Sequence, residues 1–329
     1  MINVRYGKYD ITEIVTNVEW SGHSEKPNRQ LNVSLKNTLD GETQVIKIEK
    51  GGLVEFRNNK VLLFRGIVFA TDINELGDMS ITAYDENIYL TKSTDNRKFT
   101  KMKASEIASR ICKDYGLLIG GISDTGYVIP KLIMRDKSLH DILLYALTLT
   151  KKQTGKRFFI WNRGGKFYLR AATENPSKYL IERGRNIISA SYSETIEDTI
   201  TQVKVIGGKK DQHVVKLKNA TLAKKYGVMQ AVEQMDEKAT KSQVEQRART
   251  LLKERGVIDD QATVEVLGID DVITGSAVYV KESMTGIVGG YYVTSDSHTY
   301  SNGVHTMTLE LSKTYDLPKI EIEKEALGK

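Results

Sequence analysis

The chain has 329 residues, of which 40% are hydrophobic and 27% are charged. This composition excludes a disordered chain, and the length suits about two or three globular domains. The 48 basic residues nearly balance the 42 acidic ones and are interleaved with them. A solvated mixed surface is therefore favoured over a dedicated nucleic-acid-binding face.

The single cysteine, Cys112, excludes a disulfide framework within the chain. The amino terminus lacks the basic and then apolar pattern of a signal peptide, and no apolar run reaches the length of a membrane span. We therefore expect no membrane span and synthesis in the cytoplasm.

Residues 1–96 are expected to form a first domain of short β-strands. Apolar and polar residues alternate in this region over residues 46–49, 53–56 and 79–84. Residues 57–60, Arg-Asn-Asn-Lys, separate two such segments and suit a hairpin turn, because Asn tolerates a positive φ. Closely spaced strands with turn residues between them indicate a small barrel or sandwich.

Residues 97–175 are expected to form an α/β unit. One helix is predicted from the spacing of Ala104, Ile107, Ala108, Ile111, Cys112 and Tyr115, with Gly116 after its end. A second helix begins near Ser138, which has capping-box spacing to Asp141. Residues 158–161 and 166–169 then predict a hairpin around Asn-Arg-Gly-Gly.

Residues 176–317 return to the strand pattern and are expected to form a second β domain. Residues 173–177 mark the candidate boundary, and one helix is predicted at about 237–255. Strands are predicted at 201–206, 262–267, 277–280, 291–295 and 304–311. Residues 318–329 form a charged tail that we expect to become ordered only through a partner.

His298 and His305 are the best metal-site candidates in the sequence. They flank Tyr-Ser-Asn-Gly at 300–303, a probable hairpin turn, so the two imidazoles can face each other across two strands. Asp296 is the nearest third ligand. Histidine pairs seldom bind a metal without further ligands, so a structural hairpin is the favoured interpretation.

Other catalytic signatures are missing or broken. Cys112 lies on the apolar face of its helix, and the pairs Asp259-Asp260 and Asp270-Asp271 fall in expected turns. Residues 154–157, Thr-Gly-Lys-Arg, resemble the end of a P-loop, but Thr150 stands where its first glycine belongs. Residues 207–210, Gly-Gly-Lys-Lys, are not followed by an expected helix. The sequence therefore predicts no catalytic residue, no cofactor-binding residue and no metal site.

Two groups of basic residues leave nucleic-acid binding open as an alternative. The groups are Lys209, Lys210, Lys216, Lys218, Lys224 and Lys225, and Lys151, Lys152, Lys156, Arg157 and Arg163. Aromatic residues near the second group suit single-stranded nucleic acid. Acidic residues return soon after each group, however, so a solvated loop and a helix C-terminus are favoured.

Several segments together resemble the baseplate hub proteins of phage tails, in the XkdQ/YqbQ family of PBSX-like prophages of Gram-positive bacteria. The segments are Ile14–Gly22, Arg29–Leu35, Leu63–Val68, Ala83–Leu90, Leu139–Lys156 and Ser297–Met307. Each motif is weak alone, but their order and spacing are specific, and the similarity extends over nearly the whole chain.

The resemblance implies a homotrimer in which two tail-tube-like β-barrel domains of each chain flank the α/β domain. Three chains would then adapt a hexameric tail tube to a trimeric central spike in the baseplate of a contractile tail or tail-like bacteriocin. Further expected partners are the tape-measure protein and other baseplate and LysM-type tail proteins. The alternatives are a tail-associated peptidoglycan hydrolase and, less favoured, a nucleic-acid-binding protein.

Overall fold

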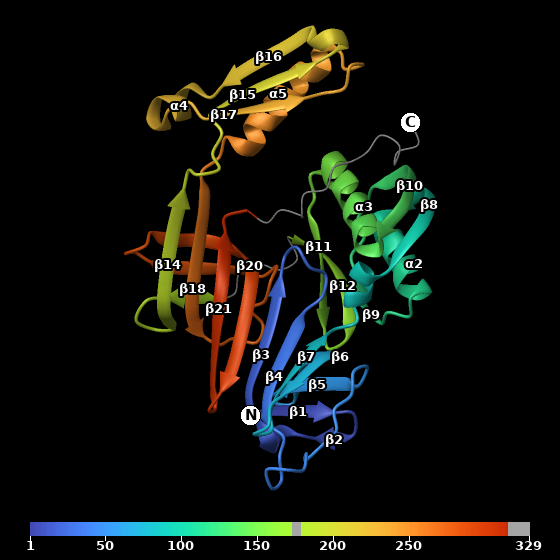
Figure 1. The fold of residues 1–329 in the computed structure, drawn as a ribbon, viewed down its shortest axis with the longest axis vertical. Helices are drawn as coiled ribbons and strands as arrows, with labels where there is room; N and C mark the ends of the chain where they lie inside the picture. The colour runs from blue at the N-terminus through green and yellow to red at the C-terminus, as the bar shows by residue number, and fades with distance from the viewer. Residues whose placement is uncertain (173–178, 315–329) are drawn as a thin grey trace. The chain divides into compact units, whose positions relative to one another are not determined.

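The computed structural model describes residues 1–172 and 179–314. The chain separates into two compact units, which we call unit 1 (residues 1–191 and 263–329) and unit 2 (residues 192–262) (Figure 1). Most of the described secondary structure is β-strand, as the sequence predicts. The candidate boundary at 173–177 and the tail at 318–329 both lie outside the described residues.

One 13-stranded sheet runs through unit 1 and contains strands from both ends of the chain. Its main path is β14-β18-β21-β20-β3-β4-β7-β6-β5-β1-β2, and β19 and β13 branch from β20. The early strands are β1 (Ile2–Tyr6), β2 (Tyr9–Asp10), β3 (Val15–His23), β4 (Gln30–Lys36), β5 (Leu53–Asn58), β6 (Val61–Ile73) and β7 (Asp78–Tyr84). The late strands are β13 (Leu180–Glu182), β14 (Ile187–Thr195), β18 (Asp259–Leu267), β19 (Ala277–Glu282), β20 (Ile287–Ser301) and β21 (Val304–Ser312).

The pairing of β20 with β3 joins the two ends of the chain. Seven consecutive residues, Ser295–Ser301, pair antiparallel with Asn17–His23. Side chains follow this continuity, because Ile273 and Tyr300 pack into the same buried cluster as Trp20 and Phe56. The two β regions therefore share a sheet and a core. In the described part of the chain, the strand order does not close either region into a barrel.

The predicted hairpins are present, and their turns have the required backbone. Asn59 and Lys60 both have positive φ between β5 and β6, as do Asn302 and Gly303 between β20 and β21. This geometry suits two-residue turns that match the right-handed twist of the strands. A short 3-10 helix, Thr12–Ile14, and helix α1 (Ile88–Lys92) complete the N-terminal region.

Residues 94–171 contain five strands and two helices around a buried core of their own. The elements are β8 (Thr94–Lys103), α2 (Ala104–Asp114), β9 (Ile119–Ile122), β10 (Val128–Ser138), α3 (Leu139–Thr154), β11 (Phe158–Arg163) and β12 (Lys166–Ala171). Both predicted helices are confirmed, and each is followed by a glycine with positive φ, Gly116 or Gly155. The Ser138 side chain accepts a hydrogen bond from the Asp141 amide at 3.0 Å, so it caps α3.

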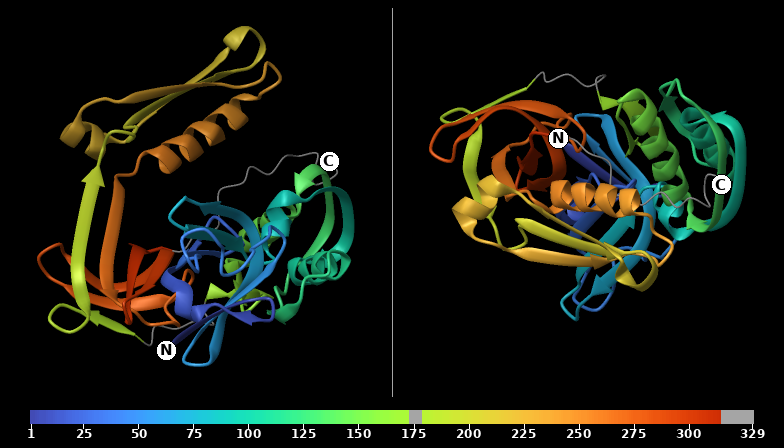
Figure 2. Two further views of the ribbon diagram at one scale, coloured as in Figure 1. Left: turned by 60° about the horizontal axis from the view of Figure 1, so that its bottom comes forward. Right: turned by 90° about the horizontal axis from the view of Figure 1, so that it is seen from above.

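Unit 2 is a three-stranded sheet with one long helix along one face (Figure 2). The sheet order is β16 (His213–Lys218), β15 (Gln202–Gly207), β17 (Gln230–Gln234). Helix α5 (Lys241–Arg255) packs Val244, Ala248 and Leu251 against Val203 and Val205 of the central strand. A 3-10 turn, Lys209–Asp211, and helix α4 (Ala220–Tyr226) connect the strands.

Four sequence expectations about local structure are wrong. Residues 46–49 are not a strand, because the Asn37 side chain bonds both the amide and the carbonyl of Ile46 and holds an irregular segment. Asp259 and Asp260 begin β18 rather than lie in a turn. Helix α5 begins after its Thr240 cap, later than residue 237. The lysine-rich segment after Gly208 contains strand β16 and helix α4 rather than a plain loop.

Candidate functional site

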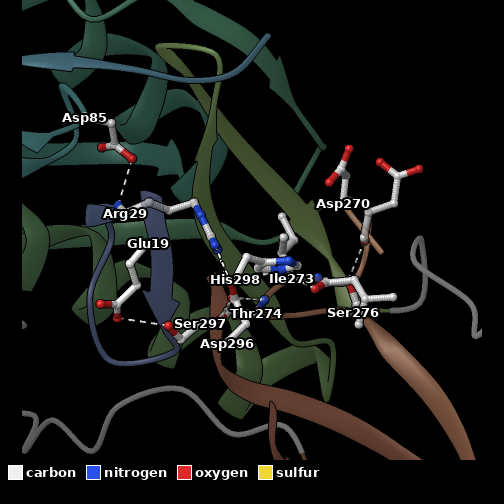
Figure 3. Close-up of polar contacts among 12 residues, drawn as sticks. Glu19, Arg29, Asp85, Asp270, Ile273, Thr274, Ser276, Asp296, Ser297 and His298 are labelled. Atoms are coloured by element: carbon white, nitrogen blue, oxygen red, sulfur yellow. Dashed lines mark hydrogen bonds and ion pairs between the residues drawn. The ribbon is translucent and has the colours of Figure 1, made fainter. Parts of the chain in front are cut away.

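The most buried cluster of charged groups lies where β20 meets β3, and Arg29 and Asp296 are at its centre (Figure 3). Arg29 immediately precedes β4, and Asp296 lies within β20. The guanidinium holds both carboxylate oxygens, with Nη1 2.9 Å from Oδ1 and Nη2 on Oδ2. Thr274 donates to Oδ1 from its amide and its hydroxyl, each at 2.6 Å. The carboxylate is therefore fully engaged by fixed donors.

Two residues of β3, Trp20 and Gly22, make room for the Arg29 side chain. Its guanidinium carbon lies 4.0 Å from the centre of the Trp20 ring, a cation–π geometry. A Cβ at Gly22 would lie only 2.3 Å from Arg29 Nη1. A glycine at position 22 is thus what lets the ion pair sit against the strand.

The neighbouring Arg29 stabilises the charged form of the Asp296 carboxyl. Complete burial by itself raises the pKa of the Asp296 carboxyl, but the Arg29 guanidinium and its hydrogen bonds outweigh burial and lower the pKa well below its ordinary range. Asp85 behaves in the opposite way. Burial raises the pKa of Asp85 well above its ordinary value, although the amides of Arg29 and Asn87 donate to its carboxylate.

His298 and His305 meet as the sequence predicts. His298 Nδ1 lies 3.0 Å from His305 Nε2, and His298 Nε2 lies 3.0 Å from the Val272 carbonyl. A carbonyl can only accept, so His298 Nε2–H donates to the Val272 carbonyl. Asp296 Oδ2 lies 3.4 Å from His298 Nε2, so all three candidate residues are close together.

His305 links this network to the surface turn that carries Asp270. Its Nδ1 lies 3.5 Å from Asp270 Oδ1, and its ring stacks on Tyr300 with 3.9 Å between ring centres. The Tyr300 hydroxyl donates to the same Asp270 oxygen at 2.7 Å. Burial and the neighbouring His298 lower the pKa of His305 to about 4, while Asp270 opposes this effect. His305 is therefore neutral at pH 7.

The arrangement suits a structural junction better than a metal site. Each imidazole nitrogen of His298 already faces a partner, and Asp296 is bound by Arg29 and Thr274. No group of three His, Cys, Asp or Glu side chains that could hold a metal ion occurs within residues 1–172 and 179–314. What the cluster can do is fix β20, β3 and the 270–276 loop against one another.

The other candidate residues lie apart from this junction. Cys112 is buried in α2, and burial raises the pKa of its thiol to about 12, so the reactive thiolate is suppressed. Asp270 and Asp271 lie in a turn, as expected, and Asp271 pairs with Arg163 at 2.8 Å. Gly155 and Gly208 each have positive φ at the end of a helix or strand. No helix in the described part of the chain is long and apolar enough to cross a membrane.

Sequence patterns gave no signal for the Arg29–Asp296 pair. The two residues are 267 positions apart, and a lone arginine before a strand is usually exposed. The feature that could have suggested it is the sequence Trp20-Ser21-Gly22, where a large aromatic ring and a missing side chain lie two positions apart on one strand face.

Comparison with known proteins shows which family the chain belongs to and which solved structures share its fold. The YQBQ-like family model matches residues 18–312. The phage-like element PBSX protein XkdQ of Bacillus subtilis is 32% identical over 93% of this chain and 94% of its own length. The 43 kDa tail protein of prophage MuSo2 from Shewanella oneidensis has a similar fold, with a TM-score of 0.70, 13% identity, and 95% and 97% of the two chains covered.

A type VI secretion system component from E. coli is also similar in fold, with a TM-score of 0.57 and 8% identity over 97% of this chain and 79% of that one. Its structure is described as similar to the T4 tail proteins gp27 and gp5. The similarities to the MuSo2 tail protein and to the E. coli protein show a shared fold alone. The family model and the Bacillus relative both extend over nearly the whole chain, and the chain belongs to the YQBQ-like family.

Proposed function

We propose that this chain is a structural baseplate hub of a contractile phage tail or phage-tail-like particle. In this role a homotrimer joins the hexameric tail tube to the trimeric central spike. Membership of the YQBQ-like family carries the proposal, because a relative with 32% identity along nearly its whole length is named as a phage-like element protein. The similar folds belong to tail and secretion-system proteins rather than to enzymes.

The domain plan belongs to the proposal as well. Residues 1–96 and 176–317 would supply one tube-like β domain each, residues 97–175 the α/β domain between them, and residues 318–329 a tail. Three chains would then present six β domains toward a sixfold tube. The tail-tube protein, the central spike, the tape-measure protein and LysM-type baseplate proteins would be the partners.

The pairing of β20 with β3, together with the buried Arg29–Asp296 pair, supports this role physically. An adapter can match a sixfold ring only if its two β regions keep one fixed relation in every copy. Seven paired residues between β20 and β3, and the buried Arg29–Asp296 pair behind them, provide such a fixed relation. A buried, two-point charge pair resists small displacements, because any displacement leaves an uncompensated buried charge.

Deletion of the gene from a strain that produces tail-like particles tests the proposal. We expect no complete particles in electron micrographs, and full recovery when the unchanged gene is supplied on a plasmid. The protein should also appear in purified wild-type particles at the end of the tube that carries the spike. Normal particles from the deletion strain would contradict the proposal.

A further inference from the structure

The free side of β16 in unit 2 is a surface that the proposed function leaves unassigned. β16 lies at the end of the sheet order, and β15 pairs with it along one side from His213 to Lys218. Among the described residues, no strand pairs with its other side. An edge of this kind offers unpaired amide and carbonyl groups to an incoming strand.

The two faces of β16 differ in chemistry. Val214, Lys216 and Lys218 are exposed on the face away from α5. Val215 and Leu217 point the other way and are half-buried against the core of unit 2. A strand added at this edge would therefore place one set of alternate side chains beside two ammonium groups and the other set beside apolar carbon.

The strand residues of the exposed face include three lysines and no carboxylate, although Asp211 of the 3-10 turn accepts a hydrogen bond from Gln234 at the end of the face away from Lys218. Lys216 lies directly opposite Lys204 of β15, and like charges in that position destabilise a sheet. In the part of unit 2 that the structure describes, no ion pair engages Lys204, Lys216 or Lys218. The sheet register and burial pattern place no Asp or Glu on this face, whose members are Gln202, Lys204, Ile206, Val214, Lys216, Lys218, Gln230, Val232 and Gln234.

We propose that the β16 edge binds an extended polypeptide segment in which acidic and apolar residues alternate, by addition as a fourth strand. The acidic side chains would lie beside Lys216 and Lys218, and the apolar ones beside Val215 and Leu217. Edge lysines repel most strands, so this edge selects for acidic ones. The site goes beyond the proposed hub function, which names partners but no surface for them.

The face suits a polypeptide better than a nucleic acid. Val214 and Val232 are 55% and 59% exposed on the same face as the lysines, and none of the face residues is aromatic. Phosphates gain nothing from exposed valines, and bases need aromatic rings for stacking. An acidic strand uses both the lysines and the apolar carbon.

A suitable probe is a fluorescent peptide with the sequence of residues 317–326, which contains Ile-Glu-Ile-Glu at 320–323. These residues lie outside the described part of the chain. The full-length chain should bind the peptide in an anisotropy titration at low salt. The full-length variant E321K/E323K, whose own copy of the sequence no longer matches the site, should bind it at least as tightly.

Charge reversal identifies the site. K216E/K218E should weaken peptide binding by at least about tenfold, while K224E/K225E, which changes the same charge on α4, should leave it unaltered. A peptide with Glu321→Lys and Glu323→Lys should bind K216E/K218E more tightly than it binds the unchanged chain. Equal weakening by the two double variants would overturn the assignment to β16.

Backbone methylation tests strand addition itself. A strand that pairs along one side donates only alternate amides, so N-methylation at Ile320 and Ile322, or at Glu321 and Glu323, should abolish binding for only one of the two sets. Equal binding by both methylated peptides would overturn strand pairing. The proposal would be overturned if the peptide bound neither the unchanged chain nor E321K/E323K. It would also be overturned if single-stranded DNA, and not the peptide, bound in a way that depends on the lysines.

Discussion

At the residue scale, the fold depends on a few buried polar groups whose partners are distant in sequence. Arg29 and Asp296 are nearly inaccessible to solvent, with side-chain exposures of 5% and 0%. The cost of burying each charge is offset mainly by the other, with help from Thr274 at Asp296 and from the Trp20 ring at Arg29. The pair therefore contributes more to which strands meet than to the total free energy of folding.

Removal of one partner should be far more damaging than removal of both. R29A should lower the free energy of unfolding by about 3–5 kcal/mol, because it leaves the Asp296 carboxylate buried without its counter-charge. R29M/D296L should cost less than the sum of R29M and D296L. Urea denaturation of R29A, R29M, D296L and R29M/D296L, each against the unchanged chain, measures this coupling, and additive losses would contradict a coupled pair.

Acid should weaken the fold through His305. Its pKa is about 4 in the folded chain and about 6.5 when unfolded, so the unfolded chain takes up a proton first as the pH falls. Stability is then lost as the pH falls from about 6.5 to about 4, and protonation of His305 causes no further loss below pH 4. His140, whose pKa burial also lowers to about 4, acts in the same direction, while buried Asp85 opposes it.

H305Q removes the titrating group but keeps a donor toward His298. The difference in the free energy of unfolding between pH 7 and pH 5 should therefore be smaller in H305Q than in the unchanged chain. Urea denaturation at both pH values measures it. An unchanged difference would show that His305 does not carry the pH dependence.

At the element scale, the close contact between β3 and the Arg29 side chain determines how the first and last β regions join. Gly22 supplies the space on β3, and Gly290 on β20 offers a matched comparison, because a Cβ there would meet no atom within 4 Å. The register in which β20 pairs with β3 is thus coupled to the side chain of Arg29, which lies in neither strand.

G22A should displace Arg29 from Asp296 and lower the free energy of unfolding by about 1–3 kcal/mol. G290A should change it by less than about 0.5 kcal/mol. Thermal or urea unfolding of both variants makes the comparison. Equal effects would mean that the space at position 22 does not matter to the pair.

Local patterns in the sequence were enough for many elements. The helical spacing from Ala104 to Tyr115 and the cap at Ser138 predicted α2 and α3 with their ends, because these signals lie within one turn of each residue. Alternation alone misassigned residues 46–49, where one Asn37 side chain determines the backbone. Partner choice between β3 and β20 depends on contacts across most of the chain, which no local window contains.

The same division holds for the candidate site. The hairpin turn at Asn302 and Gly303 predicted that His298 and His305 would meet, and they do. The environment that makes them structural was not predictable, because it comes from Arg29 and Val272 on other elements. Sequence resemblance, which integrates weak motifs over the chain, identified the family where local chemistry could not.

At the scale of the whole molecule, the chain belongs to the YQBQ-like family and has the fold of prophage tail proteins. The buried Arg29–Asp296 pair joins segments that are distant in the sequence, and the His298–His305 contact joins β20 to β21. The proposed trimeric adapter role would place the protein's function in the contacts between copies and with the tube and spike.

Mass photometry of the full-length chain, alone and mixed with tail-tube and central-spike proteins from the same genome, tests this role most directly. We expect the mass of three chains for the protein alone or with the spike, and a larger complex that contains three chains when the tube protein is added. A chain that stays monomeric in every mixture would contradict the account.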